Sequence, residues 1–131
     1  TRYADRQIIV YPDPACKQRK TSAGGKTDLN ILQNAGLTVR VKNAHPQVRD
    51  RINAVNSRLK NTNDQRMMFI DPKCKNIIRG LERHLYKEGT TQPDKDSGFD
   101  HMNDAIGYAV DYLFPIRKQY TKQLPQRWSV K

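Results

Sequence analysis

Three short apolar stretches of the chain have the pattern of β-strands. Residues 7–12 are a β-branched and aromatic run that ends at Pro12, which is typical of a buried strand. Residues 37–42 alternate apolar and polar positions, and residues 67–71 form a third run, closed by Pro72. We therefore expect three short strands.

Helical signals mark the segments between and after these strands. Thr27 is a predicted N-cap, and the helix that it starts should end at Gly36. A second helix begins at Pro46 and has one apolar face, made by Val48, Ile52, Val55 and Leu59. Its basic residues are expected on the other faces: Arg49, Arg51, Arg58 and Lys60. Two further apolar faces predict helices over 74–89 and 101–114.

The alternation of strands and helices decides the expected fold class. It predicts βαβ units and therefore an α/β fold, with a mainly parallel or mixed sheet flanked by helices. A chain of 131 residues has the size of one domain. We expect residues 1–115 to form it, followed by a basic tail over 116–131.

Charge adds the first functional indication. The chain has 24 Lys and Arg against 13 Asp and Glu, which gives a net charge of +11 and a pI near 9.9. A domain this basic most often binds a polyanion, and the alternative is a solvated surface that is simply basic. No apolar run reaches the roughly 20 residues that span a bilayer, so no membrane partner is expected. Cys16 and Cys74 give no zinc framework and indicate a reducing compartment.

Asp13 is the first candidate for chemistry, because it follows the predicted strand 7–12. Functional groups of α/β sheets gather at the carboxyl ends of strands, where a carboxylate can reach a bound metal. The alternative is a structural role, since Asp-Pro after a strand is common in turns.

A second group of candidates lies at the start of the last predicted helix. Asp100, His101 and Asp104 are close together there, and oxygen and imidazole ligands suit Mg²⁺ or Mn²⁺. Asp104 in a first turn would also simply complement the helix dipole, and a lone His more often has a structural bond than a metal. Asp111 is nearly two turns further on, and we expect it to form a salt bridge.

The loop after Asp13 concentrates positive charge. The residues expected to contact DNA phosphates there are Lys17, Arg19, Lys20 and Lys26. The Gly-Gly-Lys-Thr sequence at 24–27 lacks the earlier glycine of a nucleotide-binding P-loop, so we exclude an NTPase. Aromatic residues are sparse, which argues against a platform for stacking single strands.

Four blocks of the sequence, in this order, resemble the nuclease domain of tailed-phage large terminase subunits. They are VYPDPACKQRKTSAGGKTDLNIL, VRDRINAVNSRL, DPKCKNIIRGLERHLY and HMNDAIGYAVDYLFP. The most specific element is Asp-His-x-x-Asp-Ala-x-Gly-Tyr, which begins at Asp100.

The resemblance implies a ribonuclease H-like fold in which three acidic positions hold two divalent metals, Mg²⁺ or Mn²⁺. Asp13 matches the second acid of the family, Asp104 matches the third, and His101 falls near the metal. The implied function is an endonuclease that cuts concatemeric viral DNA during packaging, in the host cytoplasm. The implied partners are double-stranded DNA, an ATPase domain of the same parent chain, the portal and the small terminase subunit.

The chain departs from the family at its beginning. The first acid of the family lies on the first strand of the fold, well before the second, and here only 12 residues precede Asp13. The first strands and the ATPase motifs are therefore expected to be missing, and the chain alone should have weak or no nuclease activity. A non-catalytic DNA-binding module and a portal-docking module are the alternative functions.

Overall fold

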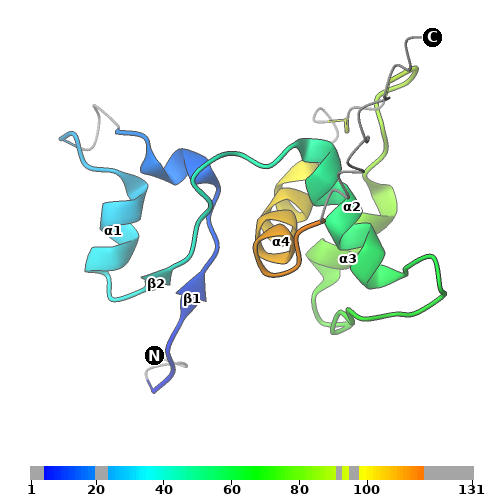
Figure 1. Cartoon of the computed structure of the whole chain (residues 1–131), viewed down its shortest axis with the longest axis horizontal. Coiled ribbons are helices and arrows are strands. Elements are labelled where there is room, and N and C mark those ends of the chain that lie inside the picture. Colours follow the sequence, from blue (N-terminus) through cyan, green and yellow to red (C-terminus); the bar gives the residue numbers. More distant parts are fainter. Residues whose placement is uncertain (1–4, 20–23, 91–92, 95–97, 117–131) are drawn as a thin grey trace, which may run out of the picture.

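A computed structural model of the chain describes residues 5–19, 24–90, 93–94 and 98–116. The elements form two groups that lie side by side (Figure 1). The first consists of β1 (Ile9–Val10), the 3-10 helix η1 (Pro14–Lys17), α1 (Asp28–Asn34) and β2 (Thr38–Val39). The second consists of α2 (Val48–Leu59), α3 (Lys75–Arg83) and α4 (Asp100–Leu113).

The first group follows from local sequence signals. The Thr27 hydroxyl accepts a bond from the Asn30 amide, and the Asn30 side chain accepts one from the Thr27 amide, which together form a capping box. After α1, Gly36 has a φ of 80°, a conformation that favours glycine. The chain then returns as β2, which pairs in parallel with β1 and places Val39 opposite Val10. The expected α/β class is confirmed.

The second group has a small apolar core. Both α2 and α3 pack on α4. Ala54, Val55 and Val110 are buried at the centre, and the residues packed around them are Leu59, Met68, Leu81 and Ile106. The predicted apolar faces are therefore only partly buried. In α2, Val55 is buried but Val48 is exposed, and in α4 the predicted inward residues Met102 and Leu113 are exposed, because the helix turns Val110 toward the core instead.

The predicted strand at 67–71 is wrong, because this segment has no regular secondary structure. The amides of Met67 and Met68 both donate to the carbonyl of Arg58 near the end of α2, at 2.9 Å. Phe69 is 83% exposed. Over the described ranges the sheet contains only β1 and β2, so no strand lies where residues 67–71 could pair.

The third predicted helix also ends earlier than expected. α3 stops at Arg83 rather than at Gly89, and Leu85 is largely exposed. The His84 ring, directly after the helix, contacts the Asn103 amide and the Asp94 carbonyl, each at 2.9 Å. These contacts of the His84 side chain stabilise the non-helical segment after Arg83, where the sequence predicted the last turn of this helix. The predicted tail, 116–131, lies almost wholly outside the described residues.

One side of α4 joins the two groups. Lys42, beyond β2, forms an ion pair with Asp111 at 2.5 Å, which confirms the salt bridge expected for Asp111. The rings of Tyr11 and Tyr112 lie 5.3 Å apart between centroids. None of the helices in the described part of the chain is long and apolar enough to cross a membrane.

Candidate functional site

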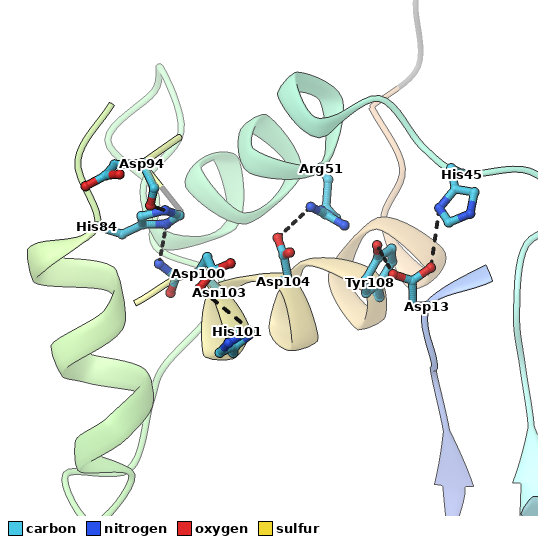
Figure 2. Close-up of polar contacts among 10 residues, drawn as sticks. All are labelled: Asp13, His45, Arg51, His84, Asp94, Asp100, His101, Asn103, Asp104 and Tyr108. Atoms are coloured by element: carbon cyan, nitrogen blue, oxygen red, sulfur yellow. Dashed lines mark hydrogen bonds and ion pairs between the residues drawn. The ribbon is translucent and has the colours of Figure 1, made fainter. Parts of the chain in front are cut away.

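Asp13 lies where β1 ends and η1 begins, and both of its carboxylate oxygens have partners. Oδ1 accepts a bond from the amide of Ala15 at 2.8 Å, so Asp13 caps η1 as a turn residue would. Oδ2 accepts a bond from the Tyr108 hydroxyl of α4 at 2.7 Å. Nδ1 of His45 lies 3.3 Å from Oδ1. The structural role expected as an alternative is therefore present, and Asp13 also reaches the last helix (Figure 2).

The surroundings of Asp13 favour its ionised form and lower its pKa. Partial burial by itself raises the pKa of Asp13, but the bonds from the Ala15 amide and the Tyr108 hydroxyl lower it. The charges of His45 and Arg51 lower it further, so the pKa of Asp13 falls below its usual value. Burial, and then the bond to Asp13, raise the pKa of Tyr108 to about 12. Tyr108 is thus a neutral donor to a carboxylate.

Replacing Tyr108 with Phe should raise the pKa of Asp13, because the variant loses a bond that favours the charged form. A carboxylate with a lowered pKa stabilises the fold above its unfolded value of about 3.9 and loses this contribution as pH falls through its folded pKa. The Tyr108→Phe variant should therefore lose less stability than the unchanged chain as the pH falls through this acidic range. An NMR titration of the Asp13 carboxyl carbon measures the shift, and Tyr112→Phe is the control. An unchanged Asp13 pKa in Tyr108→Phe would contradict the role given to the hydroxyl.

Asp104 lies one turn before Tyr108 on α4, and the two side chains are therefore on the same side of this helix. The helix begins at Asp100, so Asp104 is in its second turn rather than in the first turn that the sequence predicted. Its Oδ1 accepts a bond from Nη2 of Arg51 on α2 at 2.5 Å. The side chain of Asp104 is 37% exposed, so solvent still reaches this carboxylate.

Arg51 connects the two candidate acids. Its guanidinium bonds to Asp104 and also lies over the Tyr108 ring, 4.3 Å from the centroid. Tyr108 in turn bonds to Asp13. Figure 2 shows the four side chains along one face of α4. The ion pair and the cation–π contact thus join α2 to α4, and the hydrogen bond joins the residue after β1 to α4.

The structure does not bring His101 to these residues. The His101 side chain is 84% exposed and its Nδ1 lies 3.8 Å from Oδ1 of Asp100. In Figure 2 it points away from Arg51. Asp100 is buried, and its Oδ1 has no hydrogen-bond partner. Within the described ranges, no three His, Cys, Asp or Glu side chains gather as metal ligands would.

Asp13 and Asp104 nevertheless fit a divalent cation by their chemistry. Each offers carboxylate oxygens, the ligands that Mg²⁺ and Mn²⁺ prefer, and each is partly exposed. In the described structure Asp13 lies beside His45, and Asp104 is paired with Arg51. The described residues therefore include two of the three acids that the resemblance implies.

The basic loop divides into residues with different roles. Nζ of Lys17 donates to the carbonyl of Lys42 and to Oδ1 of Asn43, at 3.0 and 2.9 Å, so it holds the chain after β2. Arg19 and Lys26 are exposed, and Arg19 pairs with Thr27 through a backbone bridge. Lys20 lies outside the described residues. Of the four predicted phosphate contacts, Arg19 and Lys26 are the described residues with exposed side chains.

The sequence analysis did not assign three residues to the site: Arg51, Tyr108 and His45. Arg51 was assigned to the faces of its helix away from the apolar one, which is wrong, because it is buried. It lies four residues before Val55 on the buried face, so the helical period was a usable signal. Tyr108 belongs to the motif that carries the resemblance, but nothing in the sequence gave its partner. For His45 we find no sequence signal.

Comparison with known proteins places this site in a family. The family model described as the terminase RNaseH-like domain matches residues 6–113. The chain therefore belongs to the terminase ribonuclease H-like family, the nuclease domain of viral DNA-packaging terminases, which typically depends on metal. Searches of curated proteins and of solved structures gave no match.

Proposed function

We propose that the chain is the DNA-cutting part of a viral terminase, a divalent-metal-dependent endonuclease that cuts concatemeric DNA during genome packaging. The observation that carries this proposal is that Arg51 and Tyr108 link Asp104 to Asp13 beside α4, in a chain of the terminase nuclease family. The two acids come from a strand end and a helix, far apart in the sequence. A pure DNA-binding module has no need of carboxylates joined in this way.

Asp13 and Asp104 are the proposed ligands of Mg²⁺ or Mn²⁺. When bound, such ions activate water and stabilise the leaving oxygen of a phosphodiester. Tyr108 fixes the orientation of Asp13 through its hydroxyl, and Arg51 fixes that of Asp104. The exposed charges of Arg19 and Lys26 neutralise DNA phosphates beside them. The geometry gives no support to His101 as a third ligand.

The wider assembly follows the family. We propose that the chain works beside an ATPase domain of the same parent protein, with the portal and the small terminase subunit, in the host cytoplasm. A non-catalytic DNA-binding module is the second candidate. The observation in its favour is that both carboxylates already have partners and that no three-ligand group occurs in the described part of the chain.

DNA binding is expected to be sequence-tolerant and to weaken steeply with salt, because it rests on phosphate contacts. Replacing Arg19 and Lys26 with Ala should weaken binding equally for all sequences. It should also reduce the slope of log affinity against log salt by about 0.9 for each phosphate that is no longer neutralised. Fluorescence anisotropy with short duplexes across a salt series measures both quantities.

The control removes the same charge elsewhere, by Lys75→Ala with Arg79→Ala on α3. Both of these residues are exposed and belong to the other group of elements. An equal loss of affinity in the control would show that net charge, rather than the loop, binds DNA. An affinity that does not change with salt concentration would contradict the phosphate-contact model.

A further inference from the structure

Arg51 is the most deeply buried cation among the described residues. Only 7% of its side chain is exposed, although it belongs to a helix with an otherwise solvated basic surface. Its stem fits against Gly107, where a Cβ atom would lie 2.8 Å from Cγ and 2.9 Å from Cδ of Arg51. The helix–helix contact is thus shaped around this one arginine, which indicates a specific role for its guanidinium.

The charge of Arg51 requires a permanent counter-charge. A guanidinium does not lose its proton in proteins, and a buried charge is stable only when it is paired. Asp104 supplies that pair directly, and the Tyr108 ring covers one face of the cation. The positive charge also acts on Asp13 and lowers its pKa. Arg51 therefore supplies positive charge to both candidate acids.

A pocket opens beside this ion pair. It has a volume of about 140 Å³, and Arg51, Asp104 and Gly107 contribute to its lining together with Asn103 and Val55. The pocket is large enough for several water molecules, since one water occupies about 30 Å³ in the liquid. A hydrated cation can therefore reach Asp104 from the pocket, but it would meet the guanidinium beside the carboxylate.

We propose that Arg51 is a built-in counter-cation that competes with divalent metal for Asp104. Mg²⁺ or Mn²⁺ then binds Asp104 fully only when the Arg51–Asp104 ion pair is released. This inference rests on the proposed function, in which Asp104 is a metal ligand. Arg51 is a positioning residue, since it acts on the metal through Asp104. Its consequence is a lowered affinity of the chain for metal.

The test measures Mn²⁺ binding directly, by the loss of the free-ion EPR signal, with the 131-residue chain. The variants are Arg51→Met, which keeps an apolar stem against Gly107 and removes the charge, and Arg51→Lys, which keeps the charge. Arg51→Met should bind Mn²⁺ about tenfold more tightly than the unchanged chain, the size expected for one charge-assisted hydrogen bond. Arg51→Lys should stay close to the unchanged chain. Asp104→Asn should remove the gain in an Arg51→Met background.

The outcomes separate the two proposals. If Arg51→Met binds Mn²⁺ no more tightly while Asp104→Asn still weakens binding, the competition is overturned and Asp104 remains a metal ligand. If Asp104→Asn changes Mn²⁺ binding in neither background, the metal role of Asp104 itself is wrong.

A second measurement needs no substitution of Arg51. The Nε–Hε resonance of Arg51, followed by NMR during a Mg²⁺ titration, should shift in the unchanged chain and stay constant in Asp104→Asn. A resonance that stays constant in the unchanged chain at saturating Mg²⁺ would show that the ion pair persists, and it would overturn the proposal even if Arg51→Met does not fold.

Discussion

Asp104→Asn should abolish metal-dependent DNA cleavage, with a loss of about 100-fold or more, and leave DNA binding unchanged. Asn keeps the shape of the side chain and can still accept the Arg51 bond, but it lacks the negative charge that a divalent cation requires. Changes to residues that merely support a metal ligand already cost about 10–100-fold, so the loss of a ligand should cost at least as much. In the proposed function, DNA binding rests on other residues, the exposed Arg19 and Lys26, and should therefore be unaffected.

The assay is agarose electrophoresis of supercoiled plasmid with Mn²⁺, with and without EDTA. For this assay, residues 1–131 are joined behind the first strands that the family resemblance implies, because the described residues include two of the three implied acids. Asp64→Asn is the matched control, since Asp64 is exposed and pairs only locally with Lys60. Cleavage that persists in EDTA, or that survives Asp104→Asn, would refute the metal-dependent mechanism.

The largest expected effect on stability comes from Lys42→Met. Lys42 is the ion-pair partner of Asp111, whose side chain is only 4% exposed. Met leaves this carboxylate buried without its counter-charge, and such losses typically cost about 3–5 kcal/mol. Because Lys42 is one-third exposed, water replaces part of the interaction, and we expect a loss of about 2–3 kcal/mol.

Thermal and urea unfolding, followed by circular dichroism, measure the effect of Lys42→Met. In a chain of this size, each kcal/mol lowers the melting temperature by roughly 4 °C. Adding Asp111→Asn to Lys42→Met should recover much of the loss, because it removes the buried charge. A double variant no more stable than Lys42→Met would show that packing of the Lys42 stem, rather than the charge, is what the fold requires.

The sequence predicted most of the helical structure because the relevant signals are local. The Thr27 cap, the glycine at 36 and the apolar period from Val48 to Leu59 act within one or two turns. The segment 67–71 shows the limit of such signals. Its apolar residues suit a strand, but a strand needs a neighbouring strand, and within the described ranges its backbone bonds at Met67 and Met68 go to the end of α2.

The candidate site was likewise only partly predictable from the sequence. The position of Asp13 after a strand and of Asp104 in an apolar helix could be read from the sequence, as could the salt bridge of Asp111. The exposed position of His101 could not, because its direction depends on where the other side chains of α4 are packed.

The sequence by itself determined the α/β class, the net positive charge, the extent of α4 and the two acids that match the terminase motif. Only the tertiary structure decided the partners of those acids. Arg51 reaches Asp104 because α2 packs on α4 where Gly107 leaves room for its stem, and Tyr108 reaches Asp13 because α4 also contacts the end of β1. These bonds join residues 53 and 95 positions apart, and their formation depends on packing rather than on local sequence preference.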